Sequence, residues 1–211
     1  LFFLLNGRKN RRFLCKFVAN VEISIAMLIK FSVNNYRGFA DKIEWDLSHP
    51  SNYSFNQNAI KDNILKNGII YGPNGAGKSN LGLAVFDIAN HLSHKWKKPD
   101  YYLNYASAYN YNQPVNFEYV FKFEDDTILY KYSKVAKELK GELVKEQLFL
   151  NEKELFYNDA GTLRLNKDFA LTDMAIDSVR NSANNISIVN YLLSVVPFPK
   201  GHALLKLSKW M

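Results

Sequence analysis

The sequence predicts an α/β fold in which a mixed sheet is followed by an antiparallel β meander and by the beginning of a helical subdomain. Three observations predict it: a strand pattern that leads into the glycine-rich residues 72–79, alternating apolar and polar residues between 117 and 165, and helical spacing of apolar residues after Leu171. The chain has 211 residues, 47% of them hydrophobic and 22% charged, so it can bury a core. We expect one lobe at residues 27–170 and a truncated helical subdomain at 171–211.

Residues 1–26 are expected to be an extension without a role in the fold. They contain five basic residues and one acidic residue, Glu22, so their net charge is +4 of the +7 of the chain. Residues 27–211 then have a net charge of only +3, which gives little support for nucleic-acid binding. The apolar residues precede the basic cluster, opposite to a secretory signal, and no stretch reaches the roughly 18 apolar residues of a membrane span. A helix packed on the domain and a targeting segment are the alternatives. We expect no membrane attachment, and the single cysteine, Cys15, favours a reducing, cytoplasmic location.

The first elements are a hairpin, a strand and a helix. Residues 28–33 and 42–47 alternate well enough to form a hairpin, with turn chemistry at residues 34–38. Residues 64–71 form an apolar pattern that predicts a strand running straight into Gly72. Four apolar residues then recur at spacings of three and four, which predicts a helix from Ser79 to about His94; they are Leu81, Val85, Ile88 and Leu92.

An antiparallel meander is predicted next. Residues 117–123 and 128–135 alternate around a turn at Asp125-Asp126, and shorter strands follow at 142–150, 154–157 and 162–165. Residues 101–111 are rich in Tyr and Asn without a clear period, so we expect a loop whose rings pack on the domain; base stacking is the alternative. Helical spacing appears from Leu171 through Val179 and again at 186–193, before Pro197 and Pro199.

The eight residues between the predicted strand and helix have the composition of a phosphate-binding loop; they are Gly72, Pro73, Asn74, Gly75, Ala76, Gly77, Lys78 and Ser79. Glycines let backbone N–H groups approach an anion closely, and the following helix directs its positive end at the same anion. Lys78 suits the β- and γ-phosphates, and the Ser79 hydroxyl suits a bridging magnesium ion. The motif therefore predicts binding of ATP or another nucleoside triphosphate with Mg²⁺, with Ser79 as the metal ligand.

Residues 72–81, read as Gly-Pro-Asn-Gly-Ala-Gly-Lys-Ser-Asn-Leu, resemble the ABC-type ATPase heads of RecF and structural-maintenance-of-chromosomes proteins, and bacterial AAA-family ATPases allied to the overcoming-lysogenization-defect group. Residues 31–39, with Asn35-Tyr36-Arg37-Gly38, resemble the Asn-Phe-Arg-like turn that precedes the loop in these families. The resemblance covers about residues 27–211 and implies a P-loop NTPase fold with an ABC-ATPase-like mixed sheet. It also implies that Asn80 and Arg37 lie close to the nucleotide, with a surface arginine in a turn as the equal alternative for Arg37.

The same resemblance implies a homodimer of ATP-bound heads, with DNA or a phage-defence effector nuclease as partner. Such heads hydrolyse ATP with a Leu-Ser-Gly-Gly-like signature and an apolar strand that ends in Asp-Glu, and neither motif occurs in this sequence. Asp125-Asp126 is better explained by the turn, and neither Gln113 nor Gln147 has a setting that selects it as the glutamine these heads use. No catalytic residue is therefore identified, and we expect the N-terminal portion of a longer ATPase, inactive or weak by itself.

Two other functions are alternatives to this one. A nucleotide-binding interaction module that does not hydrolyse ATP is the main alternative, and a P-loop kinase acting on a small molecule is disfavoured by the long meander. His91 and His94 share a helix face but lack a third ligand, so we expect a surface pair rather than a metal site, and His49 and His202 are expected to be unpaired. The basic residues 95–98 are expected to be a solvated helix end.

Overall fold

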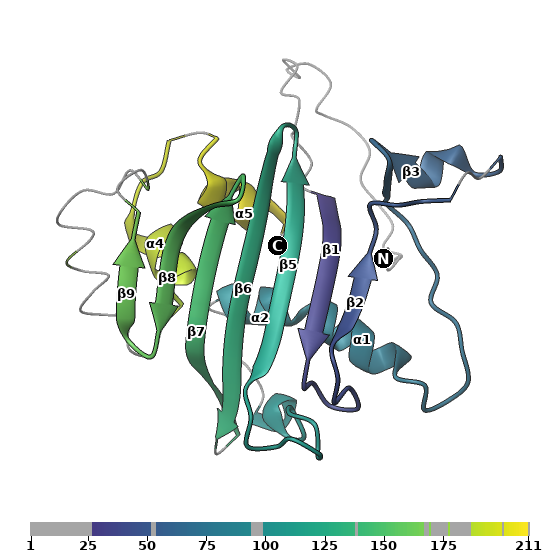
Figure 1. Cartoon of the computed structure of the whole chain (residues 1–211), viewed down its shortest axis with the longest axis horizontal. Helices are drawn as coiled ribbons and strands as arrows, with labels where there is room; N and C mark the ends of the chain where they lie inside the picture. The colour runs from purple at the N-terminus through teal and green to yellow at the C-terminus, as the bar shows by residue number, and fades with distance from the viewer. Residues whose placement is uncertain are drawn as a thin grey trace, which may run out of the picture.

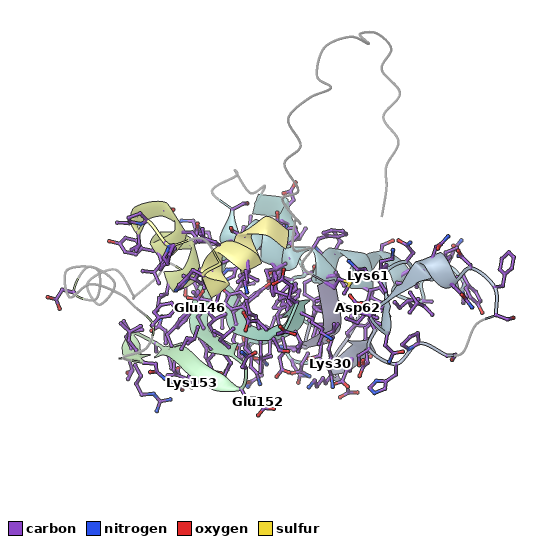
Figure 2. The ribbon with its side chains drawn as sticks, turned by 90° about the horizontal axis from the view of Figure 1, so that it is seen from above. Lys30, Lys61, Asp62, Glu146, Glu152 and Lys153 are labelled. Carbon is purple, nitrogen blue, oxygen red and sulfur yellow. The ribbon has the colours of Figure 1, made fainter. Side chains whose placement is uncertain are left out.

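The computed structural model describes residues 27–51, 54–93, 99–137, 139–166, 169, 177, 187–199 and 201–210. Within these residues a seven-stranded sheet has the order β2-β1-β5-β6-β7-β8-β9, and every neighbouring pair is antiparallel. Helices cover one face of this sheet (Figures 1 and 2). The fold is therefore mixed α/β with an antiparallel sheet and few helices.

The strands confirm the predicted hairpin and meander. Their bounds are β1 (Met27–Asn34), β2 (Ile43–Asp46), β5 (Val115–Phe123), β6 (Asp126–Lys137), β7 (Lys140–Leu150), β8 (Lys153–Asp159) and β9 (Thr162–Leu165). Strand β5 alternates strictly between buried and half-buried residues, as expected for a sheet with one covered face. Asp125 lies in the turn between β5 and β6 and Asp126 begins β6, which confirms their assignment to turn chemistry.

The predicted strand at residues 64–71 is wrong for most of its length. Only Ile64–Leu65 forms a strand, β4, which pairs with β3 (Ile60–Lys61) after the short helix η1 (Gln57–Ala59). Residues 66–77 have no regular structure, and the side chains of Ile69 and Tyr71 are each 91% exposed. A strand needs a neighbour for its backbone hydrogen bonds, and no strand among the described residues pairs with this segment. The parallel strands of a P-loop NTPase sheet stay a prediction.

The predicted helix from Ser79 is divided in two. Helix α1 spans Lys78–Val85 and α2 spans Asp87–Leu92, with Phe86 between them. The remaining helices are η2 (Pro99–Tyr102), α4 (Ile188–Val195) and α5 (Ala203–Trp210). Helix α4 confirms the spacing at 186–193, and α5 lies within the predicted helical subdomain at 171–211, where the sequence pattern singles out no helix after the prolines. The other helical expectation, at 171–179, lies almost entirely outside the described residues, as do residues 1–26 and 94–98.

The core lies between the sheet and the helices and is rich in aromatic rings. Phe31, Phe117, Tyr119 and Tyr130 are completely buried. A buried tyrosine needs a hydrogen-bond partner for its hydroxyl, and Tyr119 finds one in the main-chain oxygen of Ala84, at 2.9 Å. The sheet thereby holds α1 in place. Among the described residues, no helix is both long and apolar enough to cross a membrane.

Candidate functional site

The glycine-rich loop is exposed from Gly72 to Ala76 and passes directly into α1 at Lys78. Gly75 and Gly77 have φ angles of 83° and 88°, in the left-handed region that disfavours residues with a Cβ. A Cβ at Gly77 would also lie 2.8 Å from Cε1 of Phe39. Both the backbone conformation and the contact with Phe39 therefore require glycine at position 77.

Lys78 folds back over the loop. Its Nζ atom donates hydrogen bonds to the main-chain oxygens of Gly72, at 2.7 Å, and Pro73, at 2.6 Å. The ammonium group thus joins the start of the loop to the first residue of α1. Ser79, the second residue of this helix, is exposed beside the loop.

The turn that carries Arg37 lies against the start of α1. Tyr36 and Phe39 close the turn with two main-chain hydrogen bonds of 2.9 and 2.8 Å, and Arg37 has a φ of 50°. Phe39 contacts Gly77, and a Cβ at Gly38 would lie 3.4 Å from Nδ2 of Asn80. The turn of Arg37 and the start of α1 are therefore neighbours in space, although about 40 residues separate them in the sequence. Both segments are predicted to lie near the nucleotide.

Arg37 lies in a turn, is half-buried and makes several contacts. Its Nη2 donates to the main-chain oxygen of Tyr101 at 3.1 Å, and its Nε donates to the hydroxyl of Tyr36 at 3.1 Å. Its main-chain N–H donates to the oxygen of Tyr105 at 3.0 Å. The guanidinium carbon also lies 5.5 Å from the Tyr36 ring centroid, within range of a cation–π contact.

A cavity of about 660 Å³ opens beside this turn and the first turn of α1, and we call it the Arg37 cavity. Aromatic rings, amides and one cation line it; they include Arg37, Asn80, Tyr102, Asn104, Tyr105 and Tyr111. The loop with many Tyr and Asn residues therefore packs partly on the domain, as expected, and partly forms the wall of this cavity. Tyr102 and Tyr105 are buried, whereas Tyr111 is 69% exposed.

A completely buried carboxylate, Asp87, lies at the first residue of α2. Its Oδ1 accepts hydrogen bonds from the hydroxyls of Tyr101 (2.6 Å) and Tyr105 (2.9 Å). Its Oδ2 accepts from the Tyr132 hydroxyl (2.7 Å) and from Nζ of Lys134 (2.9 Å). Burial opposes ionisation of Asp87, but the charge of Lys134 and these hydrogen bonds outweigh it, so the pKa of Asp87 is lowered.

A second buried carboxylate, Glu146, lies further along the sheet. Its Oε1 accepts from the hydroxyls of Tyr130 (2.5 Å) and Ser187 (2.7 Å), and its Oε2 accepts from the main-chain N–H of Ile188 at 2.6 Å, at the start of α4. Figure 2 shows Glu146 between the sheet and the C-terminal helices. Burial opposes ionisation, yet His91 and the hydroxyl donors lower the pKa of Glu146.

The expectation of a surface pair at His91 and His94 is wrong for His91. His91 is buried, and its Nε2 lies 2.8 Å from the Tyr130 hydroxyl and 3.8 Å from Glu146. Because Tyr130 gives its own proton to Glu146, Nε2 must be the donor. Burial lowers the pKa of His91 to about 4, and the charge of Lys134 acts in the same direction. His94 lies outside the described residues.

The sequence did not identify Asp87, Lys134 or Glu146. One pattern could have drawn attention to α2: Asp87 and His91 occupy the same helical spacing as the buried Ala84, Ile88 and Leu92, so the apolar face of the predicted helix contains two polar residues. A polar residue at a core position needs buried partners, and such partners are present here.

The remaining candidates lie elsewhere. Gln113 precedes β5, and Gln147 lies on the face of β7 away from the helices; neither lines the Arg37 cavity. The expectation of unpaired histidines is wrong for His49, whose Nδ1 lies 3.5 Å from Asp46, while His202 stacks on Phe198 with ring centroids 4.2 Å apart. The described residues contain no group of three side chains suited to hold a metal ion. Comparison with models of protein families and with curated proteins gave no match.

Proposed function

We propose that this chain binds ATP with Mg²⁺ through residues 72–79. The observation that carries the proposal is the motif Gly-Pro-Asn-Gly-Ala-Gly-Lys-Ser at the start of a helix, with glycine at both positions that adopt left-handed conformations. Exposed main-chain N–H groups of such a loop, together with the positive end of α1, suit a polyphosphate.

Each charged or polar group of the loop has a defined part in this proposal. On binding, Nζ of Lys78 exchanges its two main-chain carbonyl partners for phosphate oxygens, which are stronger, charged acceptors. The Ser79 hydroxyl supplies one protein oxygen to Mg²⁺, which fits the preference of this ion for few protein ligands beside phosphate oxygens and water. Magnesium would neutralise charge on the phosphates.

The nucleoside part of the ligand is assigned to the Arg37 cavity. This cavity adjoins the first turn of α1 at Asn80, and its rings and amides offer stacking surfaces and hydrogen-bond partners of the kind that a nucleoside uses. Asn80 and Arg37 are thereby proposed as nucleotide contacts, in keeping with the resemblance to ABC-type heads.

We also propose that the chain is part of an ATP-hydrolysing head that dimerises in the ATP-bound state and acts in the cytoplasm on DNA or with a defence effector. Because the sequence contains no signature motif and no apolar strand ending in Asp-Glu, we expect binding with weak turnover or none from the chain by itself. The alternative, an interaction module controlled by nucleotide occupancy, shares the binding step.

Calorimetric titration of the whole chain with magnesium-ATP tests the binding step. Lys78→Ala should weaken binding by about 10- to 100-fold, the worth of a charged hydrogen-bond donor. The control is Lys66→Ala, which removes the same charge from an exposed position just before the loop, whereas Lys78 is half-buried, and it should leave the affinity unchanged. An absence of binding by the folded wild-type chain, or equal losses in both variants, would overturn the proposal.

A further inference from the structure

The wall of the Arg37 cavity belongs largely to a segment with little regular structure, residues 99–114, in which only the short helix η2 is formed. Such a segment holds a defined shape only if other elements fix it. At its end nearest β5, Nδ2 of the buried Asn35 donates to the main-chain oxygens of Asn110 (2.9 Å) and Gln113 (3.0 Å). The other end of this segment, near η2, is held by a different residue.

That other anchor is the Oδ1 atom of Asp87. It accepts hydrogen bonds from the hydroxyls of Tyr101 and Tyr105. These two residues flank Tyr102, which lines the cavity, in the sequence. Both hydroxyls point into the core rather than into the cavity, since Asp87 is completely buried. The carboxylate therefore acts on the shape of the wall without touching anything inside the cavity.

The same two tyrosines hold Arg37. Its Nη2 is bound by the main-chain oxygen of Tyr101 and its main-chain N–H by that of Tyr105. The position of the guanidinium group thus depends on a segment whose own position depends on Asp87. The other carboxylate oxygen of Asp87, Oδ2, accepts hydrogen bonds from Tyr132 and Lys134, which both lie on β6.

We infer that Asp87 is a positioning residue, which sets the wall of the Arg37 cavity relative to the phosphate-binding loop and so determines how tightly the nucleoside part of the ligand is held. Asp87 follows α1, the helix that begins with Lys78, after the single residue Phe86. One carboxylate therefore connects the end of the phosphate-loop helix, the cavity wall and the sheet. The inference rests on the proposed nucleotide binding.

The test compares magnesium-ATP with magnesium tripolyphosphate, which has the phosphates but lacks the nucleoside. The variants are the double substitution Tyr101→Phe with Tyr105→Phe, which removes only the two hydroxyls on Oδ1, and Tyr132→Phe, which removes a hydroxyl on Oδ2 that belongs to β6. Phenylalanine preserves the rings in each case. Tyr132→Phe is the matched control, because it also weakens the bonding of Asp87 but leaves the cavity wall attached.

We expect the double variant to bind magnesium-ATP about 3- to 10-fold more weakly than the wild type, with the affinity for tripolyphosphate unchanged. Tyr132→Phe should keep the wild-type ratio of the two affinities, whatever it does to stability. The inference is overturned if the ratio stays constant in the double variant, or if Tyr132→Phe changes it equally.

The two ligands also separate this inference from the proposed function. A wild-type chain that binds tripolyphosphate and ATP equally would retain the phosphate-binding loop and overturn the role of Asp87. A wild-type chain that binds neither would overturn both. Circular dichroism shows whether each variant is folded. If the double variant loses affinity for both magnesium-ATP and tripolyphosphate because it is unfolded, the two hydroxyls serve stability rather than position, and the inference is overturned.

Discussion

Gly77 is the residue on which the shape of the loop depends most directly. Its left-handed φ and the Phe39 ring each oppose a side chain, and the two constraints act at the residue that precedes Lys78. Phe39 comes from the turn of Arg37, so the close approach of this turn to α1 is possible only because position 77 has no Cβ. The glycine therefore serves the packing of the two segments, beside the part it has in the proposed approach of an anion.

Gly77→Ala should lower the free energy of unfolding by about 1–3 kcal/mol, because alanine is strained at this φ and collides with Phe39. It should also weaken magnesium-ATP binding. The control is Gly82→Ala, inside α1 with open space around the new Cβ, which should raise the free energy of unfolding by about 0.5–1 kcal/mol. Urea unfolding and calorimetry measure both effects; equal behaviour of the two variants would contradict this account of Gly77.

Individual residues of the site differ in how far the sequence predicts them. The sequence could propose the loop residues because the motif of a phosphate-binding loop is contiguous and its chemistry depends on adjacent positions. Asp87 and Glu146 were not, because their partners Lys134 and Ser187 lie 47 and 41 residues further along the chain. Only the register of the sheet brings such groups together. For Arg37, the turn chemistry was visible, but its contacts with Tyr101 and Tyr105 were not.

Helices α2 and α4 are connected through the sheet by a row of buried polar groups. His91 on α2 donates to Tyr130 on β6, Tyr130 donates to Glu146 on β7, and Glu146 accepts the N–H of Ile188 at the start of α4. Ser187 caps the same helix by accepting the N–H of Asn190 at 3.1 Å. The imidazole in this connection is neutral near pH 7, since burial and the nearby Lys134 oppose protonation of His91.

Stability should therefore fall in mild acid. The pKa of His91 is about 4 in the folded protein and about 6.5 in the unfolded chain, so the unfolded chain binds more protons as the pH drops between these values. The expected loss is up to about 3 kcal/mol between pH 7 and pH 4. Urea unfolding at several pH values measures it. His91→Gln should flatten this dependence more than His202→Gln, whose histidine is only partly buried; an unchanged slope in His91→Gln would contradict the assignment.

The strands of the sheet were largely predictable, because alternation of apolar and polar residues directly indicates a strand with one face covered. The break between α1 and α2 was not, since the spacing of apolar residues continues through it and Asp87 adds no local signal for a helix end. The segment 66–71 was predicted as a strand from composition alone. Its residues favour an extended chain, but a strand also needs a paired neighbour, and the described residues provide none.

The two faces of the sheet differ in what covers them. Helices lie on one face of the sheet (Figure 2). The other face carries charged pairs such as Lys30 with Glu44, at 2.7 Å, and Lys131 with Glu118, at 3.3 Å. Large exposed apolar side chains are found elsewhere among the described residues, and Ile69, Ile70 and Tyr71 stand consecutively just before the glycine-rich loop. Apolar residues on both faces of an extended segment are typical of a strand buried on both sides.

Replacing these residues should reduce self-association. The double variant Ile69→Ser with Tyr71→Ser removes two side chains that are each 91% exposed, so we expect less association in light scattering and little change in the free energy of unfolding. Tyr109→Ser is the control, because Tyr109 is 88% exposed but stands between the small Ala108 and the polar Asn110 rather than beside other large apolar residues. Association that responds equally to both variants would show that the segment before the loop has no special role.

The bonding of Asp87 has a consequence for the order in which the protein acquires its structure. Its four partners lie 14, 18, 45 and 47 residues later in the chain, so the carboxylate stays without a cation until β6 has been synthesised and has paired with β5. Contacts between distant parts of a chain form after local ones, because closing a long loop costs entropy. The hairpin of β5 and β6 should therefore fold first and α2 dock onto it afterwards. A nascent chain can thus display the complete glycine-rich motif on the ribosome well before α2 is fixed to the sheet.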